Sequence, residues 1–339
     1  MDNVLTMGEI MLRLKPPEYQ RILQADTFAA NYGGSEANVA VSLALLGDQA
    51  AFLTKLPANA LGDTALATVR KFGAATSKIL RGGPRLGIYF FEKGTSVRGT
   101  NVVYDRAGSS FALAQANEFD WPTLLAGVTY FYFSGITAAL SNEMRIALLA
   151  ACQYCAAHQI TVVCDVNYRG KMWPPADAQA AMAKLMPYVN ICIANDEDFA
   201  GSLGIQAFDG DMTRGIEQKD SFVAAMQQIQ RQYPSVHTVA SVVRDMPTAD
   251  DNTCTALLVQ GEQVYQGRTY HVHVMEGVAN GDAFGAALVH GLISHFTPQQ
   301  MIDYASTASV LKLTIHGDLN VITDADIQKT LSSNSNVSR

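Results

Sequence analysis

A single acid, Asp282, stands directly before an apolar, alanine-rich run in the segment EGVANGDAFGAALVHGL, residues 276–292. The residues just before it, 279–281, are small or flexible, so a ligand can approach the backbone closely there. If a helix begins at this point, its free N–H groups can hold an anion while the carboxylate faces the same place. Backbone donors beside one carboxylate suit phosphoryl transfer, which needs positioning, charge stabilisation and an acceptor for a hydroxyl proton.

The same acid also has an ordinary structural interpretation. A carboxylate in the first turn of a helix accepts hydrogen bonds from unpaired N–H groups and favours the positive end of the helix dipole. Against this interpretation, Asn280 could cap the turn by itself. The residue types alone leave both interpretations of Asp282 open.

Three more polar stretches occupy comparable places. NYGGSEAN (31–38) precedes the first long helical run, DVNYRG (165–170) follows a strand-like run, and ANDED (194–198) follows the next one. Ligands of parallel α/β sheets bind at the carboxyl ends of the strands, so we expect these stretches and residues 279–282 to meet at one site. Each stretch taken singly is also typical of a turn or a helix cap.

The elements that must position these stretches alternate along the chain. Residues 128–135, 160–167 and 190–195 are short β-rich runs, and residues 142–159 and 176–189 between them carry apolar side chains at helical spacing. Continuous apolar strands separated by amphipathic helices predict a parallel sheet covered on both faces. Helices are further expected over 220–233, 280–296 and 298–313, and strands over 236–243, 254–261 and 263–274.

Two strand-like runs lie outside this alternation. Residues 85–94 and 100–108 alternate with period two and are joined by a turn that contains Gly, Thr and Ser. Together with segments near the N-terminus, they are expected to form a small antiparallel sheet that stands off the core. We interpret this sheet as a lid formed from about residues 11–34 and 82–112.

Composition restricts the class of function. The 339 residues are 48% hydrophobic and 16% charged, with a formal net charge of -7, which is typical of a globular protein and argues against binding nucleic acid or an anionic membrane. One domain over residues 1–330 is expected, followed by a short polar tail, 331–339, that is expected to be disordered. There is no long uncharged apolar run, and the first residues lack the basic character of a signal peptide, so a cytoplasmic location is expected.

The five cysteines are an odd number in a long chain, which favours reduced thiols over a disulfide framework. Cys152, Cys155 and His158 have a spacing that could serve a metal or redox site. They lie in a helical apolar run without a second ligand pair, so we expect the thiols to pack as small apolar groups. No P-loop and no G-x-G-x-x-G fingerprint is present, so NAD binding is not expected.

The stretches NYGGSEANVAVSLALLG (31–47) and NGDAFGAAL (280–288) resemble the two signature regions of the PfkB (ribokinase-like) carbohydrate kinase family. The resemblance covers about residues 3–330. It implies an α/β fold, a ribokinase-like three-layer sandwich with a central, mostly parallel sheet and a small β lid. In the family motif D-T-x-G-A-G-D-x-F, the final Asp is the base that acts on the sugar hydroxyl, and the small residues before it form an anion hole. The resemblance assigns these roles to Asp282 and to Ala279, Asn280 and Gly281.

Within that family, residues 87–94, 102–110 and 164–173 resemble 2-keto-3-deoxygluconate kinases. The sugar-acid pocket implied by this resemblance consists of Gly34, Tyr89, Tyr104, Arg106, Arg169 and Asp282. The tyrosines could instead be ordinary strand aromatics and the arginines surface residues. A substrate carboxylate gives the arginines a purpose, because a guanidinium fork matches it and an acidic protein must supply positive charge locally.

Several positions depart from the family pattern. The leading Asp is Glu276 here, the first anion-hole Gly is Ala279, and the middle Ala is Asn280. The methyl group of Ala279 would narrow the phosphate approach, although alanine suits an ordinary helical or extended backbone. The family's N-x-x-E motif, which is linked to magnesium and phosphate binding, reads N-D-E-D over residues 195–198.

ATP and Mg²⁺ are the cofactors that the resemblance implies, and a need for a monovalent cation stays open. Nucleotide contacts are expected from Asn195, Arg244 and Gly281. Asp198 and Glu197 are expected to position Mg²⁺ through phosphate or water. Residues 239–252 lack the glycine-bearing strand end that commonly approaches the nucleotide in the family, so the nucleotide preference also stays open.

The sequence therefore predicts an ATP- and magnesium-dependent kinase that phosphorylates the terminal hydroxyl of 2-keto-3-deoxygluconate. One alternative keeps this chemistry and changes the substrate to fructose or another neutral ketose. Another is a non-catalytic sugar-acid sensor, suggested by Ala279 and the altered nucleotide loop. A small-molecule sugar is the expected partner, without nucleic acid or membrane, and the exposed edge of the lid sheet favours a homo-oligomer, a dimer or higher.

Overall fold

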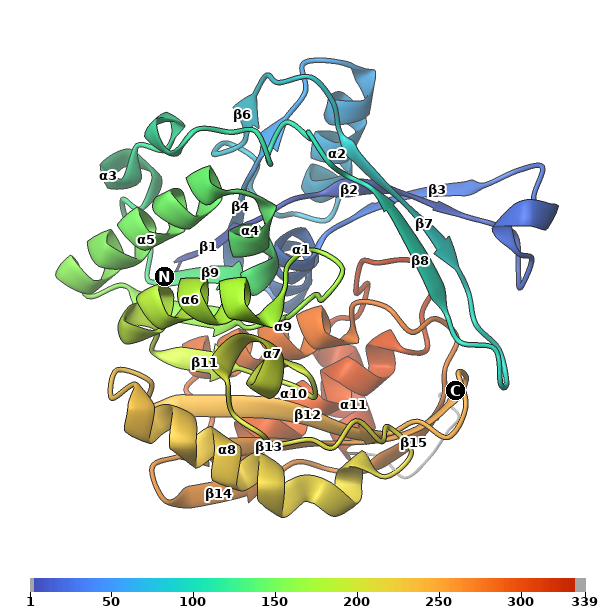
Figure 1. Cartoon of the computed structure of the whole chain (residues 1–339), viewed down its shortest axis with the longest axis vertical. Coiled ribbons are helices and arrows are strands. Elements are labelled where there is room, and N and C mark those ends of the chain that lie inside the picture. Colours follow the sequence, from blue (N-terminus) through green and yellow to red (C-terminus); the bar gives the residue numbers. More distant parts are fainter. Residues whose placement is uncertain (1–2, 333–339) are drawn as a thin grey trace.

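The computed structural model describes residues 3–332, and its centre is a nine-stranded sheet (Figure 1). The strand order is β14-β13-β12-β11-β10-β9-β1-β4, and β15 pairs with β13 beside β14. The parallel part consists of β4 (Gln49–Leu53), β1 (Asn3–Met7), β9 (Tyr130–Ser134), β10 (Thr161–Asp165), β11 (Ile191–Ile193) and β12 (Thr238–Asp245). The antiparallel part consists of β13 (Asp251–Gln260), β14 (Gln263–Gln266) and β15 (Tyr270–His273). The expected mostly parallel sheet is confirmed.

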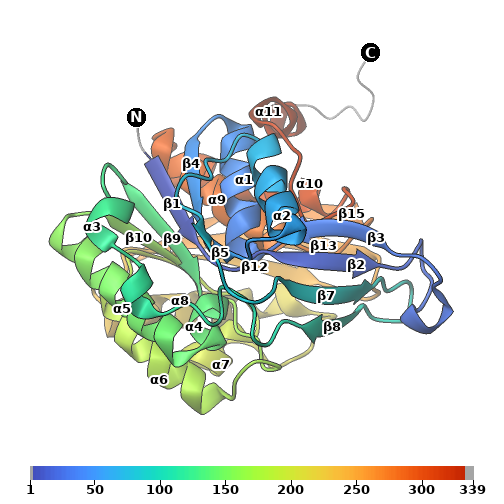
Figure 2. The same cartoon turned by 90° about the horizontal axis from the view of Figure 1, so that it is seen from above.

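Helices cover both faces of this sheet because its strands are apolar on both sides (Figure 2). In β9, Phe131 and Phe133 pack toward one helical layer, while Tyr132 between them packs toward the other. The first layer contains α3 (Trp121–Leu124), α4 (Gly135–Leu140), α5 (Asn142–Ala157), α6 (Pro175–Leu185), α7 (Asp198–Leu203) and α8 (Lys219–Gln232). The second contains α1 (Ser35–Leu46), α2 (Ala60–Lys71), α9 (Asn280–Ile293), α10 (Pro298–Lys312) and α11 (Asp324–Ser332).

A second sheet of four strands projects from the core (Figure 1), and we call it the small sheet. Its order is β3-β2-β7-β8, with β2 (Met11–Lys15), β3 (Ala29–Gly33), β7 (Gly87–Glu92) and β8 (Asn101–Asp105). The expectation of a purely antiparallel sheet is wrong, because the central strands β2 and β7 are parallel. The chain returns through β4 and α2 between them, so both strands leave the core in the same direction.

Three further details differ from expectation. Residues 263–274 form two strands rather than one, with Gly267 between them packed closely against α10. Helix α11 was not expected, and it includes residues 331–332 that were assigned to the disordered tail. The rest of that tail, 333–339, lies outside the described residues. Short strands β5 (Lys55–Leu56) and β6 (Leu80–Arg81) form a separate pair.

The cysteines lie in the protein interior. Cys152 and Cys155 are buried on α5, and burial raises the pKa of both thiols, that of Cys155 to about 12. All five cysteines are unpaired. None of the helices within residues 3–332 is long and apolar enough to cross a membrane.

A buried ion cluster joins the small sheet to the core. Arg13 of β2 is almost fully buried, donates a hydrogen bond to Glu276, and has its Nε 3.0 Å from Asp318 Oδ2. Lys15 Nζ lies 2.6 Å from the other Glu276 oxygen. Burial alone would raise the pKa of Glu276, but the charges of Arg13 and Lys15 outweigh it and lower that pKa to about 2. Glu276, which replaces the leading Asp of the family motif, therefore anchors the small sheet.

We predict that Arg13→Met lowers the free energy of unfolding by about 3–5 kcal/mol, because it leaves Asp318 buried without its counter-charge. Arg85→Met is the matched control: Asp105 ends β8 of the small sheet and Arg85 lies just before β7, but this pair is exposed to solvent, so its loss should cost much less. Urea unfolding of the two variants measures the difference. Equal losses would show that the buried cluster contributes no more than a surface pair.

Candidate active site

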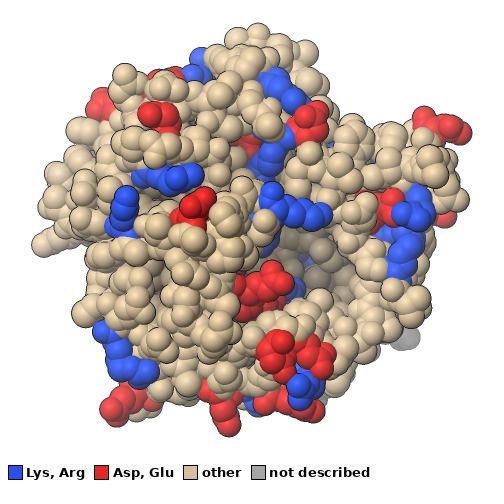
Figure 3. All heavy atoms as spheres, in the orientation of Figure 1, with Lys and Arg blue, Asp and Glu red and all other residues tan. Residues whose placement is uncertain are grey.

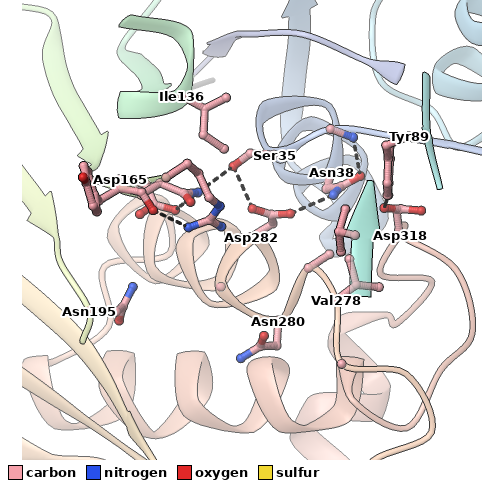
Figure 4. Close-up of a pocket in the computed structure, with 18 of the residues that line it drawn as sticks. Ser35, Asn38, Tyr89, Ile136, Asp165, Asn195, Val278, Asn280, Asp282 and Asp318 are labelled. Carbon is pink, nitrogen blue, oxygen red and sulfur yellow. Dashed lines mark hydrogen bonds between the residues drawn. The ribbon is translucent and has the colours of Figure 1, made fainter. Parts of the chain in front are cut away.

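Asp282 is the third residue of α9, and its carboxylate does not cap that helix. One carboxylate oxygen accepts a hydrogen bond from Ser35 Oγ at 2.7 Å and the other accepts one from Asn38 Nδ2 at 2.7 Å (Figure 4). The residue at the N-cap position, Ala279, makes no side-chain cap, and the Asn280 amide points toward α10 instead. The capping interpretation of Asp282 is therefore wrong.

The two donors to Asp282 come from the first turn of α1. Ser35 and Asn38 are three residues apart, so they share one face of the helix. The backbone N–H of Gly34 donates to Asn38 Oδ1 at 3.3 Å, which turns the amide nitrogen of Asn38 toward Asp282. A β-carbon at Gly34 would lie 1.9 Å from the carbonyl oxygen of Glu9, so only glycine allows α1 to begin at this place.

The surroundings of Asp282 suit a base. The side chain is buried, and this burial raises the pKa of its carboxyl group above the usual aspartate value, although the hydrogen bonds from Asn38 and Ser35 and the charge of Arg169 act in the opposite direction. A carboxylate with a raised pKa holds an accepted proton more readily than an ordinary surface aspartate. Asp282 can therefore take a proton from a bound hydroxyl group.

The backbone before Asp282 forms a cradle for an anion. The N–H groups of the first helical turn have no acceptor within the helix and no side chain caps them. At Gly281 an added β-carbon would meet no atom within 4 Å, so this face of the backbone is open to the cavity. Ala279 has φ 61° and ψ 14°, which is left-handed, so the expectation of an ordinary helical or extended backbone at this alanine is wrong.

A cavity of about 510 Å³ lies over this cradle. Figure 3 shows the surface hollowed between the core and the small sheet, with acidic side chains beside the hollow. All the site residues expected from the sequence line this one cavity: Gly34, Tyr89, Tyr104, Arg106, Arg169, Asn195, Glu197, Asp198, Arg244, Ala279, Asn280, Gly281 and Asp282.

The two arginines expected to face a substrate anion have different surroundings. Arg106 is already paired, because its Nε lies 2.8 Å from Glu9 Oε2 and its Nη2 donates to the same oxygen. Arg169 is exposed, donates to the carbonyl oxygen of Tyr168, and has no carboxylate ion-pair partner within residues 3–332. Its charge lowers the pKa of Asp282, so Arg169 is the cation available to an anionic group near the base.

Two tyrosines on the small sheet line the side of the cavity that faces away from the start of α9. Tyr89 and Tyr104 are direct cross-strand partners on β7 and β8, with ring centroids 5.9 Å apart. The Tyr89 hydroxyl donates to Asp318 (Figure 4), so this ring is fixed, whereas Tyr104 is partly exposed. The small sheet thus places one fixed and one partly exposed aromatic ring at this edge of the cavity.

The expected nucleotide and metal residues lie at the far end of the cavity. Asp198 accepts the backbone N–H groups of Asn195 at 2.7 Å and Tyr168 at 2.6 Å, and burial raises its pKa to about 6 although these hydrogen bonds oppose the shift. Arg244 Nη2 lies 2.6 Å from Asp196 Oδ2. Within residues 3–332 no three His, Cys, Asp or Glu side chains are grouped to hold a metal.

Two acidic residues of the cavity lie outside the stretches identified from the sequence: Glu9 and Asp318. Glu9 closely follows β1 at the carboxyl edge of the sheet, where a systematic search of strand ends could have found it. Asn167 Nδ2 lies 3.2 Å from Asp165 Oδ2 and 3.4 Å from Ser35 Oγ. Asp318 follows α10 in a loop, and no sequence signal marked it.

The comparison with known protein families agrees with this geometry. The model of the pfkB family of carbohydrate kinases matches residues 1–325. The chain belongs to this family. This carbohydrate kinase is similar to a 2-dehydro-3-deoxygalactonokinase of Haloferax volcanii. The two sequences are 32% identical over 97% of this chain and 96% of that protein.

Solved structures of other kinases share the fold. The 2-dehydro-3-deoxygluconokinase of Thermotoga maritima superposes with a TM-score of 0.93 and 40% sequence identity, over 98% of this chain and 100% of that one. A fructokinase of Xylella fastidiosa with bound ATP has a TM-score of 0.78 at 16% identity, over 97% and 98% of the two chains, and this match concerns the fold alone. The ribokinase-like α/β fold expected from the sequence is confirmed.

We predict that Ala279→Gly raises the free energy of unfolding by roughly 0.5–1 kcal/mol, because relief of a left-handed alanine outweighs the added chain entropy of glycine. Ala180→Gly, on the exposed face of α6, is the matched control and should lose about 1 kcal/mol. Urea unfolding reports both values. A similar loss in both variants would contradict the strain assigned to Ala279.

Proposed function

We propose that this kinase transfers the γ-phosphoryl group of ATP to the terminal hydroxyl of 2-keto-3-deoxygluconate, which is also called 2-dehydro-3-deoxygluconate. The observation that carries the proposal is the buried Asp282 carboxylate beside the uncapped start of α9, inside a cavity large enough for a sugar and a phosphate chain. The substrates named for the Haloferax and Thermotoga relatives support a sugar acid.

In the proposed reaction the substrate hydroxyl donates a hydrogen bond to Asp282. Its oxygen attacks the γ-phosphorus, the proton passes to the carboxylate, and the bond from phosphorus to the β,γ-bridging oxygen breaks to release ADP. The N–H groups at residues 280–282 stabilise the charge on the transferred group. The catalytic group is thus Asp282 with Gly281, Asn280 and Ala279.

Residues 195–198 and Arg244 form the proposed nucleotide end. Glu197 is exposed and lines the cavity, so together with Asp198 it would hold Mg²⁺ through water or phosphate oxygens. The ion would supply positive charge to the phosphate groups. The Asp196–Arg244 ion pair fixes the position of the guanidinium beside this end.

The sugar acid would lie between the cradle and the small sheet. Gly34, Tyr89, Tyr104 and Arg106 face it from one side, and Arg169 faces it from the core. We propose that the small sheet, within residues 11–34 and 82–112, is the lid that excludes water from the transferring group. The Glu9–Arg106 pair carries no net charge, and this observation favours a neutral ketose as the rival substrate. A comparison of kcat/KM for the sugar acid and for a neutral ketose separates the two substrates.

We predict that Asp282→Asn lowers kcat by at least about 100-fold, because the amide cannot accept the hydroxyl proton. In the unsubstituted enzyme, kcat/KM should fall as the pH drops through the raised pKa of Asp282, since protonation removes the base, and the variant should lack this dependence. ADP release measures both effects. Asp326→Asn is the control, because Asp326 lies in the first turn of α11 and accepts the Thr323 N–H far from the cavity. Normal turnover by Asp282→Asn would exclude its role as base.

We predict that Arg169→Ala lowers kcat/KM for the sugar acid by about 10- to 150-fold, the range of a charge-assisted hydrogen bond, and lowers it much less for fructose. For Arg106→Ala, the losses of kcat/KM on the sugar acid and on fructose should differ less, because Glu9 already neutralises Arg106. Lys184→Ala, an exposed cation on α6, controls for net charge. Equal losses on both sugars with a raised KM for ATP would place Arg169 on the nucleotide phosphates. A preference of the unsubstituted enzyme for fructose would overturn the sugar-acid assignment, and no turnover of any sugar would favour the sensor.

A further inference from the structure

Glu9 has one carboxylate oxygen in an ion pair and one without a partner. It lies between β1 and β2, its side chain is 2% exposed, and it lines the cavity. Both donors from Arg106 reach the same oxygen, Oε2. The other oxygen, Oε1, is buried and accepts no hydrogen bond from any side chain or backbone group within residues 3–332.

A buried carboxylate oxygen without a donor is costly. Ionised carboxylates have about four acceptor sites, and leaving a buried acceptor unsatisfied costs about 1–3 kcal/mol. The neighbouring strand leaves this oxygen uncovered, because a β-carbon at Gly87 would lie only 2.9 Å from Oε1 and glycine has none. A donor for Oε1 is therefore expected from the molecule that fills the cavity.

The chemistry of Oε1 restricts which substrate group it can meet. A carboxylate oxygen accepts hydrogen bonds and repels other anions, so neither the substrate carboxylate nor a phosphate group can be its partner. A hydroxyl group can donate to it. The guanidinium of Arg106 cannot turn toward this oxygen without giving up Oε2, where both of its hydrogen bonds end.

We propose that Glu9 is a substrate-binding residue whose Oε1 accepts a hydrogen bond from a hydroxyl group on C4 or C5 of the sugar acid, while its Oε2 holds Arg106 in place. This proposal rests on the proposed function for the identity of the sugar. Glu9 is attached to the core next to β1, whereas Arg106 follows β8 of the small sheet, so the pair also sets the distance between the two sheets across the cavity.

A fixed acceptor of this kind distinguishes stereoisomers. The gluconate- and galactonate-derived 2-keto-3-deoxy acids differ in the configuration of the C4 hydroxyl. An acceptor held just after core strand β1 can meet that hydroxyl in one configuration and misses it in the other. Glu9 would then determine substrate specificity in addition to contributing affinity.

The test is a cycle that combines the variant Glu9→Gln with substrates that lack single hydroxyl groups. Glutamine has one side-chain oxygen, which cannot occupy the Oε1 and Oε2 positions at once, so an acceptor is lost either for Arg106 or for the sugar. For the parent sugar acid we expect kcat/KM to fall by about 10- to 150-fold. One of the two analogues, 4-deoxy or 5-deoxy, lacks the contacted hydroxyl. On that analogue we expect kcat/KM of Glu9→Gln to be less than about threefold below that of the unsubstituted enzyme.

Glu92→Gln is the matched control. Glu92 is also a buried acid with arginine partners, Arg21 and Arg98, but it lies outside the cavity lining. Its substitution should change kcat/KM by the same factor for all three substrates. If Glu9→Gln also gives one common factor, then Glu9 only holds Arg106 and the proposal is wrong.

Two further outcomes are separated by design. If Glu9→Gln does not fold, as judged by its thermal transition, Glu9→Asp keeps the charge, withdraws the carboxylate by one methylene, and should show the same selective loss. If the unsubstituted enzyme turns over a neutral ketose and no sugar acid, the proposed function fails by itself. The cycle is then run with deoxy analogues of that ketose, where a common factor again overturns the role of Glu9.

Discussion

The hydrogen bonds from Ser35 and Asn38 to Asp282 join the first turns of α1 and α9. In the sequence, Ser35 is 247 residues and Asn38 is 244 residues from Asp282. Because the carboxylate is occupied by α1, it does not cap its own helix, and the N–H groups of α9 stay available. The proposed base and the proposed anion cradle therefore occupy the same turn. The position of the cavity follows from this contact, since α1 and α9 pack side by side on one face of the sheet and the first turns of both helices line the cavity.

The charge around the site is arranged in local pairs. The chain is acidic overall, yet acids neutralise most cationic side chains near the cavity: Arg13 and Lys15 pair with Glu276, Arg106 with Glu9, and Arg244 with Asp196. Arg169 differs, since it has no such partner within the described residues. An exposed guanidinium without a counter-charge beside a buried carboxylate attracts an incoming anion, and burial of the ligand would strengthen this attraction. Electrostatics thus favours an anionic group at one defined end of the cavity.

The small sheet is both a wall of the cavity and a part of the core's ionic structure. Arg13 attaches it to Glu276, which lies just before the cradle, and Tyr89 attaches it to Asp318. Movement of this sheet would therefore disturb the approach to α9 and the proposed sugar-binding end of the cavity together. Glu276 stands where the family motif has its leading Asp. The structural reason for the longer side chain is that it pairs with both Arg13 and Lys15.

The sequence by itself determined the features that depend on local pattern: the alternation of apolar strands and amphipathic helices, the parallel sheet, and the meeting of residues 31–38, 165–170, 194–198 and 279–282 at its carboxyl edge. These follow from periodicity and from the geometry of βαβ units. Only the tertiary structure decided the parallel pairing of β2 with β7, the left-handed backbone of Ala279, and the partners of Arg106 and Asp318. The physical reason is that these features depend on contacts between distant segments, such as the 97 residues between Glu9 and Arg106, and no local pattern records which side chains will meet.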